Sequence, residues 1–212
     1  MNSTTQTSLD ALKDIRNMME RSSRFISLSG WSGISAGICA LTGAWVAHER
    51  ISGYFNGQST TAGCPSCLKT ELIIIAFIIF VAAFFLAVSF TFIKSRKNGS
   101  FIWSASARRL LWNTLLPMVT GGILIWKMME LKQYDLIVPS TLIFYGLALV
   151  NGSKYTMGEV RYLGYAEIIT GIVSIFLVQQ GIYIWAFGFG ILHILYGLIM
   201  WWKYDQKTEE IN

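Results

Sequence analysis

Six long runs with almost no charge constrain this chain more than any other feature. They are Trp31–Ala47, Leu72–Ile93, Leu110–Trp126, Leu136–Val150, Leu163–Val178 and Ile182–Trp202. A helix that crosses a bilayer needs about 17–25 residues, so the shorter runs must borrow flanking residues such as Gly30, Asp135 or Gly152. A soluble helical protein would carry polar stripes on such segments, and these runs have none. The sequence therefore predicts an all-α integral membrane protein with six transmembrane helices.

Charged residues lie almost entirely in the segments between and beside these runs. Charged residues make up only 14% of the sequence, against about 25% in an average soluble domain. The polar N-terminus lacks the apolar core and cleavage site of a signal peptide, so we expect the first span to act as its own insertion signal. We predict three parts: an interfacial segment over 1–26, a six-helix bundle over 27–202, and a cytoplasmic tail over 203–212.

The orientation of the bundle follows from the Lys and Arg residues that flank the spans, because cytoplasmic loops carry an excess of both. One side has thirteen: Lys13, Arg16, Arg21, Arg24, Lys94, Arg96, Lys97, Arg108, Arg109, Lys154, Arg161, Lys203 and Lys207. The other side has four: Arg50, Lys69, Lys127 and Lys132. This bias predicts a plasma (inner) membrane protein with both termini in the cytoplasm. The net charge of +5 is accounted for without a nucleic-acid partner.

The residues before the first span have an amphipathic pattern. Leu12, Ile15, Met19 and Ile26 recur at helical spacing, and basic side chains occupy most of the remaining surface. Such a basic helix beside a span is expected to lie in the headgroup region against anionic lipid. Two alternatives are a cytosolic helix that docks on the bundle and a helix that binds a protein partner.

Three segments of the spans resemble one another. "GWSGISAGI" (Gly30–Ile38), "GYAEIITGI" (Gly164–Ile172) and "GILHILYGL" (Gly190–Leu198) align without gaps, and each has two glycines seven residues apart. The connections between spans 3 and 4 and between spans 5 and 6 are short, so the helices of each pair are expected to be antiparallel neighbours. We therefore predict three helical hairpins.

Small residues define one face on each of these three spans. Small side chains let helices approach closely in lipid, where packing replaces the hydrophobic drive. We expect the three faces to meet at the centre of the bundle, with Glu167 on the tight face rather than toward hydrocarbon. The predicted helix-packing glycines are Gly30, Gly33, Gly37, Gly164, Gly171, Gly190 and Gly197.

Two ionisable residues lie on these faces, Glu167 and His193. Ionisable groups inside a membrane are functional candidates by default. A polar layer in the inner half of the bundle would suit a proton relay or a cation site; its predicted members are Glu167, His193, Asn113, Tyr145 and Tyr196. Counted from the ends of the spans, Glu167 and His193 differ in depth by about 8 Å, so direct contact needs helix tilt or a bridging water.

A purely structural role is the alternative for both residues. Glu167 would then hydrogen-bond Tyr145 or Asn113, or pair with Arg109 or Arg161. A neutral His193 would donate to a backbone carbonyl.

The three cysteines are sparse and divide into two kinds. Cys39 lies inside the first span and is expected in the core, whereas Cys64 and Cys67 form "CPSC" in the 48–71 loop. A disulfide, structural or labile, is favoured there over a Zn or Cu site shared with His48 and Glu49, because a closed zinc site needs four ligands. No metal and no cofactor is predicted.

These features favour a small transporter or channel-like subunit that moves a small solute or ion. The alternative is a non-catalytic membrane sensor, assembly factor or regulatory partner. An intramembrane enzyme is not expected, because two ionisable groups come without a nucleophile, a metal-ligand set or a phosphate-binding loop. A protein partner or a homo-oligomer is compatible with either function.

Overall fold

The computed structural model describes residues 29–57, 63–97 and 105–205. The predicted interfacial segment 1–26 and residues 206–212 of the tail lie outside this part. Every regular element described is helical, which confirms the all-α prediction. The first five rods are α2 (Gly30–Phe55), α3 (Pro65–Lys97), α4 (Ala105–Glu130), α5 (Ile137–Gly152) and α6 (Glu159–Phe176). The last rod joins α7 (Gly181–Trp185), the π-helix η4 (Ala186–Leu192), α8 (His193–Met200) and the π-helix η5 (Trp201–Asp205).

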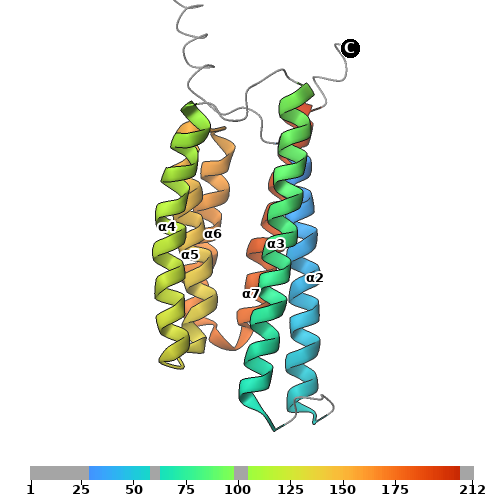
Figure 1. Ribbon diagram of the computed structural model, residues 1–212, viewed down its shortest axis with the longest axis vertical. Helices are drawn as coiled ribbons and strands as arrows, with labels where there is room; N and C mark the ends of the chain where they lie inside the picture. The colour runs from blue at the N-terminus through green and yellow to red at the C-terminus, as the bar shows by residue number, and fades with distance from the viewer. Residues whose placement is uncertain (1–28, 58–62, 98–104, 206–212) are drawn as a thin grey trace, which may run out of the picture.

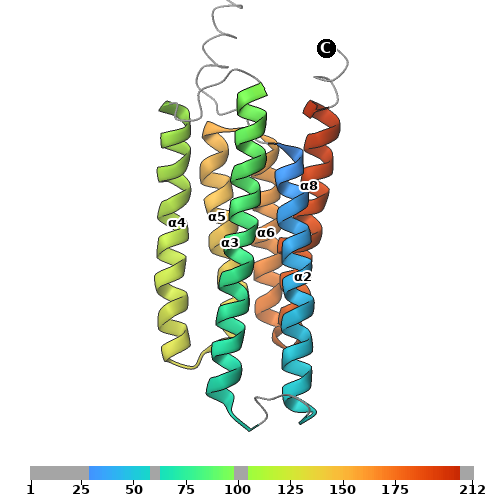
Figure 2. The ribbon, with the colours of Figure 1, turned by 45° about the vertical axis from the view of Figure 1, so that its right-hand side comes forward.

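Consecutive rods run in opposite directions (Figure 1). The start of α2, the end of α3, the start of α4, the end of α5, the start of α6 and the end of the last rod therefore share one end of the bundle (Figures 1 and 2). We call it the basic end, because eight Lys and Arg residues in the described segments flank it and four flank the opposite end. The eight are Lys94, Arg96, Lys97, Arg108, Arg109, Lys154, Arg161 and Lys203.

Glycine and proline mark several helix boundaries. Gly57, just beyond the end of α2, has a φ of +69°, a left-handed conformation that favours glycine and ends helices. Pro65 is the first residue of α3, where its missing N–H would have had no helical partner. The short 3-10 turns η1 (Tyr134–Leu136), η2 (Ser153–Tyr155) and η3 (Val178–Gln180) lie in the connections before α5, α6 and α7.

Three stretches of helix in the described residues are long and apolar enough to cross a membrane: Pro65–Arg96, Tyr134–Tyr155 and Val178–Tyr204. They indicate a membrane location for the protein. In the first, which is α3, none of the most apolar window is buried. This exposure agrees with the peripheral position that the sequence predicts for this helix, which is hydrophobic on every side.

The six rods form two groups of three (Figure 1). The first, which we call the α2 group, consists of α3, α2 and the last rod, with α2 packed between the other two. The second, which we call the α5 group, consists of α4, α5 and α6, with α5 packed between the other two. Contacts between the groups come mainly from α5 and α6 against the last rod. Thus α2 with α3 and α4 with α5 are antiparallel neighbours within a group, whereas α6 and the last rod belong to different groups.

Candidate functional site

Glycines hold α2 against the last rod at backbone distance. A Cβ atom added to Gly30 would lie 2.5 Å from the carbonyl oxygen of Gly197, and one added to Gly37 would lie 2.6 Å from that of Gly190. A Cβ on Gly33 would lie 3.1 Å from the Cα atom of Gly197. Only glycine fits such contacts, so the small faces of the first and last spans do meet.

The small face of α6 packs elsewhere, against α5. A Cβ on Gly164 would lie 2.8 Å from the carbonyl oxygen of Gly146, and one on Gly146 would lie 2.7 Å from that of Gly164. Gly171 lies against Ile143, at 2.7 Å from an added Cβ to Cγ1. The expectation that all three small faces meet is therefore wrong for the glycines of α6, because Gly146 offers α6 an equally close backbone on α5.

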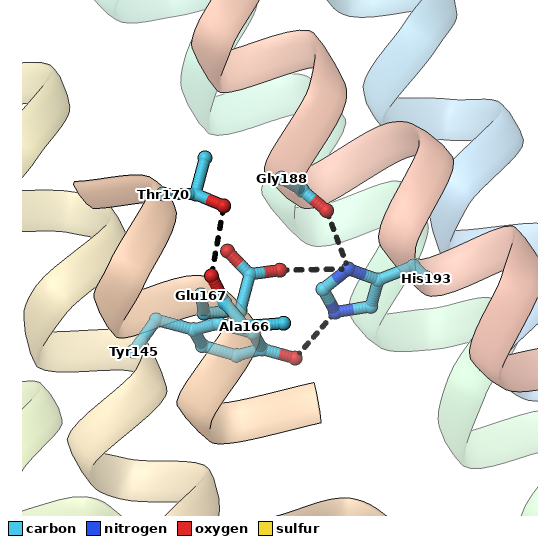
Figure 3. Close-up of polar contacts among 6 residues, drawn as sticks. All are labelled: Tyr145, Ala166, Glu167, Thr170, Gly188 and His193. Carbon is cyan, nitrogen blue, oxygen red and sulfur yellow. Dashed lines mark hydrogen bonds and ion pairs between the residues drawn. The ribbon is translucent and has the colours of Figure 1, made fainter. Parts of the chain in front are cut away.

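Glu167 lies where α6 faces the other group. Its side chain is fully buried, and Oε1 is 3.3 Å from Nδ1 of His193 on the last rod (Figure 3). A Cβ added to Gly188 would lie 2.8 Å from Oε2 of the carboxylate and 2.5 Å from Leu142 Cδ2. The carboxylate therefore fills the space that a side chain at position 188 would need.

His193 connects Glu167 to α5. Its Nε2 is 2.8 Å from the hydroxyl of Tyr145, and its Nδ1 is 3.2 Å from the carbonyl oxygen of Gly188 (Figure 3). With a proton on Nδ1, the imidazole donates a hydrogen bond to the Gly188 carbonyl and accepts one from the Tyr145 hydroxyl at Nε2. The same Nδ1 atom lies 3.3 Å from Oε1 of Glu167, an ion-pair contact that does not have hydrogen-bond geometry.

The carboxylate of Glu167 accepts no hydrogen bond from any described residue at either oxygen. A buried carboxylate without donors is strongly disfavoured unless it is neutral or balanced by a neighbouring positive charge. Two arrangements keep the pair neutral overall: protonated Glu167 beside neutral His193, or ionised Glu167 beside protonated His193. Both hold the same number of protons, so the pair carries one transferable proton.

The contact between Glu167 and His193 is closer than their positions in the sequence imply. At the basic end, Lys203 and the Tyr204 hydroxyl (2.9 Å) both donate to Oε1 of Glu159, which fixes the register of α6 against the last rod. Glu167 lies eight residues inward from Glu159, or about 12 Å, and His193 lies ten residues inward from Lys203, or about 15 Å. The predicted depth difference of about 8 Å between Glu167 and His193 is too large, because α6 begins four residues before Leu163.

Glu159 also differs electrostatically from an ordinary surface carboxylate. Burial alone raises its pKa, but the hydrogen bonds from Lys203 and Tyr204 outweigh this effect and lower the pKa below its usual range. Glu159 therefore stays ionised near neutral pH and keeps its bonds to the last rod.

The two other residues predicted for the polar layer lie outside the Glu167–His193–Tyr145 cluster. The Nδ2 atom of Asn113 donates a hydrogen bond to the backbone carbonyl of Arg109 at 2.7 Å. The backbone carbonyl of Asn113 accepts one from Asn151 Nδ2 at 2.8 Å, which helps join α4 to α5. Tyr196 lies one turn from His193 toward the basic end, and its buried hydroxyl has no partner among the described residues.

Sequence analysis missed two residues of the site, Gly188 and Phe189. The Phe189 ring stacks on His193 with centroids 5.9 Å apart and contacts Tyr145 at 5.0 Å. Gly188 precedes His193 by five residues, a spacing that puts two residues on different faces of an α-helix. The π-helix η4 brings the Gly188 carbonyl under the imidazole, and its π-helical conformation is not evident from the sequence pattern.

The structure joins Cys64 and Cys67 in a disulfide, with their Cα atoms 5.3 Å apart. Cys39 is a free, half-buried thiol in α2. In the described residues, no group of three or more His, Cys, Asp or Glu side chains is arranged to hold a metal ion.

No protein family, curated protein or solved structure matches this chain.

Proposed function

We propose that this protein is a membrane transporter that couples the movement of a small solute or ion to proton binding at Glu167, His193 and Tyr145. The observation that carries the proposal is the full burial of Glu167, whose carboxylate accepts no hydrogen bond from a described residue and has His193 Nδ1 as an ion-pair contact at 3.3 Å. A carboxyl group used only to hold helices together would be expected to accept such bonds. Beside a histidine that can take its proton, Glu167 instead has the surroundings of a proton-binding group.

The proposal includes six membrane crossings with the basic end in the cytoplasm. At about 1.5 Å per residue, the 26 residues of α2 are about 39 Å long, more than a hydrocarbon core of about 30 Å. The 18 residues of α6 are about 27 Å long, at the lower end of the about 17–25 residues that a spanning helix needs. The rods α2, α4 and α6 are not among the three stretches that are apolar enough to cross a membrane. They still expose large apolar side chains, as expected of surfaces that face lipid. Examples are Trp45 on α2, Trp112, Leu116 and Ile123 on α4, and Ile169 and Phe176 on α6.

The position of the cluster supports coupling between proton binding and a conformational change. Glu167 and Tyr145 belong to the α5 group and His193 to the α2 group, so the proton lies between two units that are each held together by close glycine contacts. Many transporters bind their ion between two such units and alternate by rocking one against the other. Losing or gaining the proton at this interface changes the attraction between the groups.

The direct test is proton-coupled flux in liposomes that contain the purified protein. We expect the parent protein to take up protons down an imposed pH gradient, and Glu167→Gln to lose this flux while its folded yield in detergent stays close to that of the parent. Glutamine keeps the size of the side chain but cannot release a proton. The readouts are an internal pH dye and the monodisperse fraction on size exclusion.

Gln180→Glu serves as a matched control, because it adds a carboxylate outside the cluster, in the connection before α7, and should leave flux unchanged. Lost yield in Glu167→Gln, combined with no flux in the parent, would refute transport and assign Glu167 a structural role.

Tyr196 extends the cluster toward the basic end. It lies about 4.5 Å along the helix axis from His193. A buried hydroxyl without a protein partner is a place where an internal water can bind. We infer that Tyr196, with water, passes protons between the cluster and the basic end.

Tyr196→Phe tests this route. Removing a hydroxyl that has no partner among the described residues should leave thermal stability unchanged or slightly raised. Proton flux should nevertheless fall several-fold, because the relay is interrupted. Tyr183→Phe, a change of the same kind on an exposed ring, is the control and should leave flux unaltered. Equal flux in Tyr196→Phe and the parent would exclude this residue from the route.

A second candidate is a non-catalytic proton sensor or regulatory membrane protein. The observation in its favour is that Glu167 and His193 are enclosed, at 0% and 6% exposed, so the site can bind a proton without passing a solute. A sensor would show a pH-dependent change in tryptophan fluorescence that Glu167→Gln abolishes, with no flux in liposomes. A transporter would show both signals.

A further inference from the structure

We propose that the outer groove between α4 and α5 binds an anionic phospholipid, with its headgroup at Lys154 and one acyl chain along the groove. The inference depends on the membrane location of the protein and not on proton coupling. Its test therefore succeeds or fails separately from that of the proposed transport.

The groove lies between two points where α4 and α5 touch. At one, a Cβ on Gly121 would lie 2.6 Å from the Cβ of Phe144; at the other, a Cβ on Gly152 would lie 2.5 Å from Thr114 Cγ2. Between them Pro117 lines α4, where it removes a backbone N–H from the helix. The helices leave an open groove of about 430 Å³ there.

The groove has the polarity of a phospholipid. Its apolar stretch is formed by Leu116 and Pro117 from α4 and by Phe144, Leu147 and Val150 from α5. Its polar end is formed by Asn151 and Lys154. An apolar surface of this shape that ends in a single cation matches an acyl chain joined to an anionic headgroup.

The length of the groove also fits an acyl chain that spans one leaflet of the bilayer. Phe144 and Lys154 are ten residues apart, which is about 15 Å along α5 and the following turn η2. The hydrocarbon core of a bilayer is about 30 Å thick, so this distance covers one leaflet. An acyl chain whose headgroup lies at Lys154 would reach Phe144 near the midplane.

Lys154 is available to a headgroup. Within the part of the chain that the structure describes, no carboxylate lies within 4.0 Å of its Nζ atom, whose nearest recorded partner is Oδ1 of Asn151 at 3.5 Å. The neighbouring Asn151 amide is occupied by the carbonyl of Asn113, which holds α4 and α5 in place beside it. The basic end adds further positive charge, which favours an anionic over a zwitterionic headgroup.

The test compares phosphatidylglycerol with phosphatidylcholine of the same acyl chains, offered at equal concentration to the purified protein in mild detergent. Native mass spectrometry counts the lipid that each protein retains. We expect the parent to retain phosphatidylglycerol about fivefold more than phosphatidylcholine, the preference that one lysine near a membrane surface provides. Lys154→Gln should reduce this ratio to about one, and Lys132→Gln, at the opposite end, should leave it unchanged.

A second variant tests the acyl-chain part of the site. Leu147 is an exposed groove residue, so Leu147→Trp should fill the groove without disturbing the core, and should lower retention of both lipids. The proposal is overturned if the parent retains both lipids equally, if Lys154→Gln keeps the parent's ratio, or if Leu147→Trp retains as much lipid as the parent.

Discussion

Replacing Gly197 by alanine is expected to pull the last rod away from α2 and to lower the free energy of unfolding by about 3 kcal/mol, the upper part of the range for overpacking. A Cβ at this position would lie 2.6 Å from both the carbonyl oxygen of Gly30 and the backbone nitrogen of Ile34. Backbone atoms cannot rotate aside as a side chain can, so the helices must separate. The readout is the midpoint of thermal unfolding in mild detergent, followed by tryptophan fluorescence.

Gly122→Ala is the matched control, because a Cβ at Gly122, inside α4, meets nothing within 4 Å. Alanine is a better helix former than glycine, by about 1 kcal/mol in water, so this variant should unfold at the same temperature as the parent or slightly higher. Equal losses in the two variants would show that the close approach of α2 and the last rod does not stabilise the bundle.

The fold was largely predictable from the sequence because the pattern that determines it is long and regular. Each of the six apolar runs overlaps one helical rod almost completely, and the rods joined by the two short connections, α4 with α5 and α6 with the last rod, are antiparallel as predicted. The shared glycine spacing also located the contact between α2 and the last rod. A glycine face identifies a close approach, but it does not identify the partner. Gly164 could have met α2 or the last rod as well as Gly146.

The site was only partly predictable, for two physical reasons. Its depth depends on where α6 begins, and α6 begins before the apolar run, at Glu159, whose carboxylate accepts hydrogen bonds from Lys203 and Tyr204. The contact between Gly188 and His193 depends on a π-helix, which no simple periodicity shows. The ionisable pair itself was visible, since Glu167 and His193 stand out in apolar surroundings. Their geometry required the tertiary structure.

A double replacement at this pair is expected to separate its contribution to stability from its contribution to function. His193→Leu alone should lower the free energy of unfolding by about 3–5 kcal/mol, because it leaves Glu167 buried without a counter-charge. Glu167→Met alone should cost less, since His193 keeps its contacts with Gly188 and Tyr145.

The double variant His193→Leu/Glu167→Met should regain most of the stability that His193→Leu loses, because replacing a buried ion pair by apolar residues of similar size is often neutral or stabilising. The four proteins form a thermodynamic cycle that denaturant titration in detergent can measure. Simple addition of the two single losses would show that the side chains do not interact. A stable double variant without proton flux would establish that the pair is retained for function, because an apolar core at the same position folds without it.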